Sequence, residues 1–183
     1  MNFANKISTF RILTVPFFVS SLIYYSAGKD FLRFVALAIF LLGVLSDAID
    51  GYIARKSKQI SKAGLILDPL GDKLLLTSAF ICLYLFLHLP LWVTLIVVSR
   101  DIIILLGAIV IFIVKKDLNV APTRWGKLTT TFQMASVVSV LLQLKISNVF
   151  WTIAVFFTLI SGIDYIMRGF KILYALDTTR NSH

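Results

Sequence analysis

The chain of 183 residues contains no glutamate, and its nine acidic residues are all aspartate. It has a single cysteine, Cys82, which excludes an internal disulfide. The cysteine and the two histidines form no cluster with metal-ligand spacing, which argues against zinc. Charged residues make up only 15% of the chain, whereas 58% is hydrophobic and the mean hydropathy is +0.90. This composition excludes an ordinary soluble domain. Cys82, with neither a disulfide partner nor a metal cluster, is expected to be a packing residue.

The sequence contains several long apolar runs with few charged residues. Each is long enough to cross roughly 30 Å of hydrocarbon, which takes about 20 helical residues. Backbone polar groups must be satisfied internally in lipid, and no alternating barrel pattern occurs, so each run is predicted to be a helix. The six predicted spans are 10–27, 33–54, 64–88, 91–114, 125–143 and 148–172. The sequence therefore predicts an all-α, polytopic membrane protein with one domain over residues 1–183.

The basic residues are distributed unevenly between the two predicted sides of the membrane. Most of the 18 fall in the N-terminus, the second and fourth connections and the C-terminus. The opposite side receives only Lys29, Arg33 and Lys145. The positive-inside rule then places both termini in the cytoplasm of a multi-pass protein of the cell's inner (plasma) membrane. Topology and anionic membrane lipids explain the net charge of +9 without a nucleic-acid partner.

Two pairs of aspartates stand beside predicted spans, where an unpaired charge is costly. Asp47 and Asp50 are three residues apart, and Asp68 and Asp72 are four apart, so on helices each pair shares one face. The pairs would converge across a short basic connection at the cytoplasmic side. Four carboxylates so close together cannot all stay ionised without cations.

The chemistry of the four carboxylates indicates the kind of ligand. Ligation by oxygen alone favours Mg²⁺, Mn²⁺ or Ca²⁺. Four carboxylates are enough to hold two such ions about 3.5 to 4 Å apart, an arrangement suited to phosphoryl transfer. Two alternatives remain open. The acids could pair with Arg55, Lys73 and Arg100 for helix packing, or they could belong to a proton- or cation-coupled carrier.

The aspartates belong to a longer pattern that resembles the signature of the CDP-alcohol phosphotransferases, which are membrane enzymes of phospholipid synthesis. That signature reads D-x-x-D-G-x-x-A-R, eight residues, then G-x-x-x-D-x-x-x-D, and all its fixed positions occur between Asp47 and Asp72. The resemblance implies transfer of a phosphatidyl or similar group from a CDP-linked donor to an alcohol, with release of CMP. It also implies a homodimer and two divalent cations, Mg²⁺ or Mn²⁺.

The same resemblance assigns a role to each position of the signature. Asp47, Asp50 and Asp68 are implied to be metal ligands. Asp72 is implied to be a metal ligand, the base that takes the acceptor's proton, or both. The remaining positions are implied to hold the CDP moiety, and they are Gly51, Ala54, Arg55 and Gly64.

Residues outside the signature bear on the acceptor alcohol. An N-terminal N-x-x-[ST]-x-x-R pattern, familiar from phosphatidylglycerophosphate synthases, is formed by Asn5, Ser8 and Arg11, although Ser8 could instead cap the first helix. An acceptor phosphate near four carboxylates needs compensating positive charge. The candidates for it are Arg100 and Lys127, assisted by Lys73 and Arg124. The alternative roles are a membrane-flanking anchor for Lys127 and a partner of Asp101 for Arg100.

Glycerol 3-phosphate is therefore the favoured acceptor and CDP-diacylglycerol the favoured donor. Gly71 departs from the D-P-x-A-D-K pattern of many phosphatidylglycerophosphate synthases, which keeps phosphatidylglycerol, inositol phosphate and serine open as acceptors. Two further features are interpreted as structural. His88 is expected to be a boundary residue, and Asp164 with Arg168 is expected to form a pair within the last helix.

Overall fold

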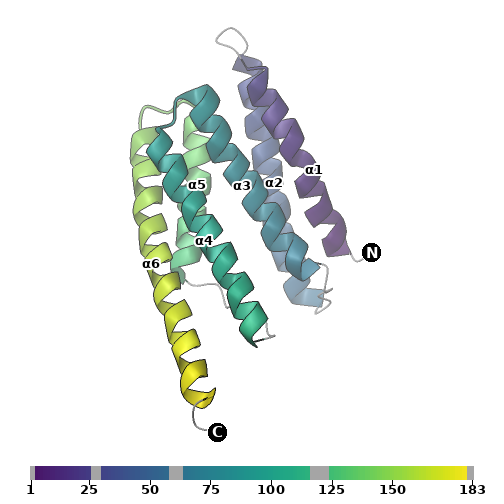
Figure 1. Cartoon of the computed structure of the whole chain (residues 1–183). Coiled ribbons are helices and arrows are strands. Elements are labelled where there is room, and N and C mark those ends of the chain that lie inside the picture. Colours follow the sequence, from purple (N-terminus) through teal and green to yellow (C-terminus); the bar gives the residue numbers. More distant parts are fainter. Residues whose placement is uncertain (1–2, 26–29, 58–63, 116–123, 181–183) are drawn as a thin grey trace. The chain divides into compact units, whose positions relative to one another are not determined.

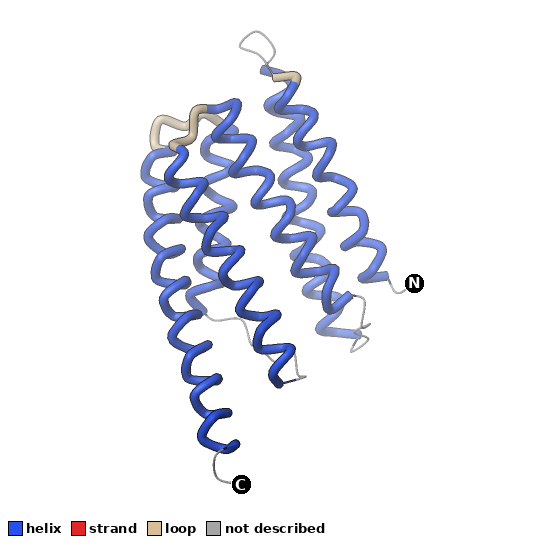
Figure 2. The backbone as a smooth tube through the Cα atoms, in the orientation of Figure 1, coloured by secondary structure: helices blue, strands red, loops and turns tan. Residues whose placement is uncertain are grey.

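A computed structural model describes the backbone of residues 3–25, 30–57, 64–115 and 124–180. It describes the side chains of residues 12–25, 30–46, 73–107, 110 and 125–169. Every element in these ranges is an α-helix, and the two connections that are fully described, residues 88–90 and 142–146, are short loops (Figures 1 and 2). The helices are α1 (Phe3–Ile23), α2 (Asp30–Ser57), α3 (Gly64–Leu87), α4 (Leu91–Lys115), α5 (Arg124–Leu141) and α6 (Ser147–Arg180). The all-α prediction is confirmed.

The predicted boundaries differ from the observed ones at both ends of the chain. Helix α1 begins at Phe3, so Ser8 lies inside the helix and cannot be its N-cap. Helix α6 continues to Arg180, eight residues beyond the predicted end of the last span at residue 172. The segment after residue 172 contains leucine and alanine but neither glycine nor proline, so nothing in it stops a helix.

The chain divides into two compact units, and the first contains α1, α2, α3 and residues 137–145. Helix α1 packs along both α2 and α3. In the core, the rings of Phe18 and Phe40 lie 6.0 Å apart between α1 and α2. Gly43 brings α2 close to α3, because a Cβ placed there would lie 2.5 Å from Leu75 Cδ2. The hairpin of α2 and α3 is thus held together by close packing near its middle.

The second unit contains α4, α6 and residues 124–136 of α5. Here a glycine again allows close approach, because a Cβ at Gly107 on α4 would lie 2.7 Å from the ring of Tyr165 on α6. Near the opposite end of these two helices, the rings of Trp92 and Trp151 meet edge to face at 5.3 Å. Ring contacts and a small residue together fix α4 against α6.

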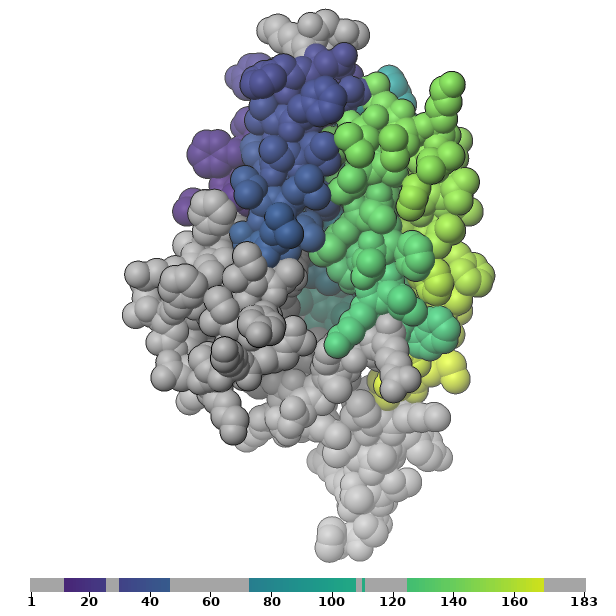
Figure 3. All heavy atoms as spheres, turned by 180° about the vertical axis from the view of Figure 1, so that it is seen from behind, coloured from purple at the N-terminus to yellow at the C-terminus, as the bar shows by residue number. Residues whose placement is uncertain are grey.

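Large apolar side chains lie at the surface of all six helices. Examples are Phe17 at 67%, Leu85 at 58% and Phe156 at 60% exposed, and the surface of α6 appears in yellow-green in Figure 3. Within the residues whose placement is described, one helical segment is long and apolar enough to cross a membrane, Ser147–Gly169. The six helices are established, whereas six membrane spans stay a prediction.

Candidate functional site

The backbone places both aspartate pairs at one end of the first unit. Asp47 and Asp50 lie in the last three turns of α2, and Asp68 and Asp72 lie in the first three turns of α3. The two helices contact each other and are joined by only six residues (Figure 1). At about 1.5 Å per residue, one pair lies roughly 10 to 15 Å from that end and the other roughly 6 to 12 Å. The two pairs therefore occupy overlapping depths along the hairpin.

Helical backbone at all four positions confirms the premise that each pair shares one face of its helix. The side chains of these four aspartates lie outside the part of the structure that is described. The same holds for the side chains of Gly51, Ala54, Arg55, Gly64, Asn5, Ser8, Arg11 and Arg124. Among the side chains that are described, no three from His, Cys, Asp and Glu come together. The assignment of the four aspartates as metal ligands therefore stays a prediction. Their carboxylate oxygens are hard donors of the kind that divalent cations such as Mg²⁺ prefer.

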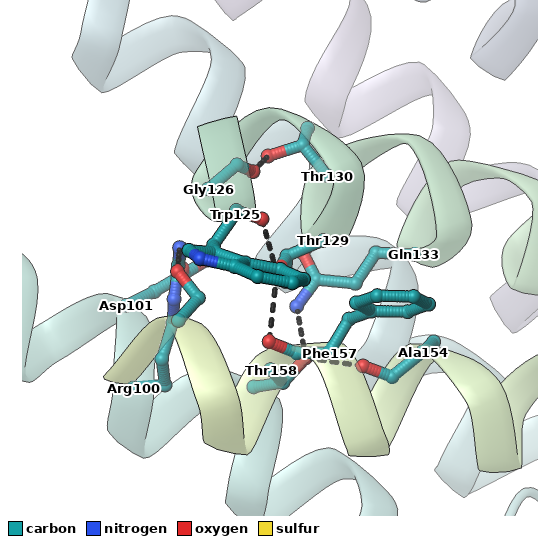
Figure 4. A network of polar contacts seen from close by, with 11 residues as sticks. Arg100, Asp101, Trp125, Gly126, Thr129, Thr130, Gln133, Ala154, Phe157 and Thr158 are labelled. Carbon is teal, nitrogen blue, oxygen red and sulfur yellow. Dashed lines mark hydrogen bonds and ion pairs between the residues drawn. The ribbon is translucent and has the colours of Figure 1, made fainter. Parts of the chain in front are cut away.

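The second unit contains a buried polar network between α5 and α6 (Figure 4). Gln133 Nε2 donates to Thr158 Oγ1 at 2.9 Å, and Thr158 Oγ1 donates to the Ala154 carbonyl at 2.6 Å. One turn away, Thr129 Oγ1 lies 2.9 Å from the carbonyl of Phe157 on α6. Gln133, Thr158 and Thr129 are fully buried. In lipid, such contacts hold helices together where apolar packing alone does not.

A buried ion pair extends this polar region to α4. Arg100 Nη1 lies 2.7 Å from Asp101 Oδ1 (Figure 4). Arg100 Nη2 donates to Ser161 Oγ on α6 at 2.6 Å. The exposed fractions of Arg100 and Asp101 are 8% and 7%. The stem of Arg100 passes beside Gly162, and its Cγ would be in ordinary contact, at 3.7 Å, with a Cβ at that position. Arg100 is thereby fixed between two helices.

The predicted acceptor-binding residues whose side chains are described differ in burial. Arg100 is buried, whereas Lys127 is exposed on α5 and Lys73 is partly exposed on α3. The alternative role of Arg100, a partner of Asp101, matches the observed contact. Its Nε has no hydrogen-bond partner among the described residues, so one donor of the guanidinium is not used by this packing role.

Thr158 and Ser161 on α6 are polar core residues that the sequence analysis missed. They lie three residues apart, and Ala154 lies one turn before them, within the helix that best fits a membrane span. A stripe of small and polar residues in an otherwise apolar run is the signal that could have revealed them. By contrast, the predicted pair within the last helix is present, because Arg168 Nε donates to Asp164 Oδ1 at 3.0 Å.

His88 and Cys82 have the structural roles expected of them. His88 is exposed directly after α3, with a φ of 56° that ends the helix. Cys82 is free and buried at 4% exposure. Among the described contacts, neither residue takes part in the buried polar network of the second unit.

Helices with apolar surfaces, internal polar contacts and an aspartate pattern at a helix hairpin define an all-helical class that is consistent with a membrane protein. A family comparison specifies this further, since the model for the CDP-alcohol phosphatidyltransferases matches residues 1–160. The chain belongs to this family of enzymes.

Curated relatives extend the match over almost the whole chain. The chain is 32% identical over 177 residues to a probable phosphatidylglycerophosphate synthase of Mycobacterium tuberculosis H37Rv, covering 93% of the chain and 82% of the relative. It is 30% identical over 184 residues to the CDP-diacylglycerol–glycerol-3-phosphate 3-phosphatidyltransferase of Aquifex aeolicus, covering 95% and 99%. The Bacillus subtilis protein of the same name is 29% identical over 189 residues, covering 94% and 97%.

Proposed function

We propose that the protein transfers a phosphatidyl group from CDP-diacylglycerol to glycerol 3-phosphate and releases CMP. The observation that carries this proposal is the complete aspartate signature on the α2–α3 hairpin of a chain that belongs to the CDP-alcohol phosphatidyltransferase family. The choice of acceptor rests on the names of relatives that align with more than nine tenths of the chain.

The four aspartates would hold two divalent cations, Mg²⁺ or Mn²⁺, as the family implies and as their oxygen donors allow. When bound, these cations neutralise the diphosphate oxygens and stabilise CMP as the leaving group. Asp72 accepts the proton of the attacking glycerol 3-phosphate hydroxyl. The hydroxyl oxygen bonds to the phosphatidyl phosphorus, and the bond from that phosphorus to the bridging oxygen breaks. CMP leaves with the electron pair of that bond.

Substrate binding is assigned to the remaining predicted residues. Gly51, Ala54 and Gly64 leave space for the nucleotide near the helix backbones, and Arg55 pairs with one of its phosphates. The acceptor phosphate needs cations, and the residues proposed to supply them are Arg100, Lys127, Lys73 and Arg124. The N-terminal motif is proposed to contribute to the same site through Asn5, Ser8 and Arg11.

The membrane arrangement is proposed on the same basis. The six helices span the inner (plasma) membrane, with both termini and the aspartate hairpin at the cytoplasmic face. Two copies of the chain form a homodimer, as the family resemblance implies.

The decisive experiment measures CMP release by the purified protein in detergent with CDP-diacylglycerol and Mg²⁺ or Mn²⁺. Glycerol 3-phosphate is added or withheld, and phosphatidylglycerol, inositol phosphate and serine are then tested in its place. Release that depends on glycerol 3-phosphate is expected. Release with another alcohol alone would overturn the acceptor while keeping the chemistry. Solute uptake into vesicles without any CMP release would instead support a carrier.

A further inference from the structure

Arg33 lies at the end of the first unit that is opposite the aspartate pairs. It belongs to the first turn of α2, 14 residues before Asp47, which corresponds to about 21 Å along the helix. The same end of the unit contains the C-terminus of α1 and residues 137–145, because Gln143 Nε2 lies 3.3 Å from the Tyr25 hydroxyl. This end is therefore remote from the proposed catalytic site.

The guanidinium of Arg33 is buried but poorly compensated. Its side chain is 8% exposed, and its only ion pair among the described residues is with Asp30 at 3.6 Å from Nη2. Asp30 is itself 63% exposed, so water weakens the attraction. Nε and Nη1 have no hydrogen-bond partner among the described residues. The face of the Phe34 ring, 5.2 Å from Cζ, contacts the cation without accepting a conventional hydrogen bond.

A buried cation with two unsatisfied donors is stabilised most by an anionic acceptor, which supplies both hydrogen bonds and compensating charge. Nη1 and Nη2 form the terminal fork of a guanidinium, which matches two oxygens of a phosphate, and Nη2 lies beyond hydrogen-bond distance of Asp30 at 3.6 Å. The local charge also favours an anion, since Lys145 is exposed at the same end and Asp30 is the single described acid there. In a membrane protein the start of a helix lies near the headgroups, where phosphate oxygens are abundant.

We infer that Arg33 forms a phosphate-binding site at the start of α2, separate from the catalytic site and occupied by the phosphodiester of a phospholipid headgroup or by free phosphate. The site stabilises the end of the first unit by giving the buried guanidinium an anionic hydrogen-bond acceptor. It does not depend on the proposed reaction.

The test measures the Tm of the purified protein in an uncharged detergent with EDTA, so that divalent cations do not link lipid to the aspartates. One sample receives dioleoyl phosphatidylglycerol, a second receives a galactosyl diacylglycerol with the same chains, and a third receives inorganic phosphate. We expect phosphatidylglycerol to raise the Tm by about 3 °C or more and the galactolipid to have little effect. A rise with inorganic phosphate alone would identify free phosphate as the ligand of the same site.

Variants then locate the effect. Arg33→Gln is expected to lose the phosphate-dependent rise, and Lys145→Gln, which removes an exposed cation from the same end, is expected to keep it. CMP release should persist in both variants. A full rise in Arg33→Gln, or an equal rise with the galactolipid in the native protein, would overturn the inference.

A second pair of measurements covers the case in which Arg33→Gln does not fold. Arg33→Lys keeps the charge but lacks the fork, so its phosphate-dependent rise should fall by at least about half. In the native protein, mass spectrometry should find phosphatidylglycerol retained in preference to the galactolipid. Equal retention of the two lipids, or an undiminished rise in Arg33→Lys, would contradict a site built on this guanidinium.

Discussion

Arg100 is the residue whose replacement should affect stability most clearly. Arg100→Met removes the cation beside the buried carboxylate of Asp101 and should lower the free energy of unfolding by about 3–5 kcal/mol. Ser161→Ala removes only the hydroxyl that accepts from Nη2, which should cost about 1–3 kcal/mol. Thermal unfolding in detergent measures both losses. A larger loss for Ser161→Ala than for Arg100→Met would contradict this ranking.

The same residue offers a test of acceptor binding. Arg100→Lys preserves the charge, so a folded variant can be compared with the native enzyme for the KM of glycerol 3-phosphate. Binding of the acceptor phosphate by Arg100 predicts that this KM rises by about tenfold or more, because a lysine cannot reproduce the fork of donors. An unchanged KM together with a lower Tm would leave Arg100 with its packing role alone.

Replacement of Asp68 tests whether catalysis can be lost while the fold is kept. Asp68→Asn keeps the size of the side chain but removes a proposed cation ligand, so CMP release should fall by at least about 100-fold while the Tm changes little. Lys145→Gln is the matched control, since it removes an exposed charge at the end of the first unit opposite the aspartates. It should retain most of the turnover at saturating glycerol 3-phosphate. An active Asp68→Asn enzyme would refute the metal assignment.

Among the helices, α5 ends in a recognisable C-terminal motif. Gln143 has a φ of 51°, and the amide of Leu144 donates to the Ser139 carbonyl at 3.0 Å while that of Gln143 donates to the Val140 carbonyl at 2.9 Å. This left-handed position favours glycine. Gln143→Gly should raise the free energy of unfolding by about 0.5–1 kcal/mol, as measured by thermal unfolding.

Gln143→Ala is the control for this substitution. It removes the exposed contact with Tyr25, as glycine does, but keeps a Cβ in the left-handed conformation. Its stability should therefore be equal to or below that of the native protein. Equal stability of the glycine and alanine variants would show that backbone strain at residue 143 is not significant.

The helices could be predicted from sequence better than their contacts. Gly64 was predicted to begin the third span and does begin α3, because the apolar run starts where the basic connection ends. The extension of α6 past residue 172 was not predicted, because the predicted span ends with the apolar run, whereas a helix can continue through polar residues where no glycine or proline stops it. Ser161 was missed because its role depends on Arg100, a residue 61 positions away in the sequence. The positions of the aspartates along their helices were predictable, whereas the fixed orientation of Arg100 needed the structure.

For the whole molecule, the buried Cys82 makes the membrane topology measurable. In a Cys82→Ser background, single cysteines can replace Lys145 and Lys127, both of which are exposed. The proposed topology places residue 145 outside and residue 127 inside. A membrane-impermeant maleimide added to intact cells should label Lys145→Cys and spare Lys127→Cys, with both labelled after lysis. Labelling of Lys127→Cys alone in intact cells would show that the topology is the reverse of the proposed one.

The length of α6 has a practical consequence. Its 34 residues correspond to about 51 Å of helix, whereas the segment suited to the membrane, Ser147–Gly169, has 23 residues and needs about 35 Å. The remaining 11 residues form a helical stalk of about 16 Å. A fluorescent protein fused to the C-terminus would then be displaced from the lipid headgroups by a stiff spacer, so energy transfer from it to a dye in the bilayer would report the tilt of α6.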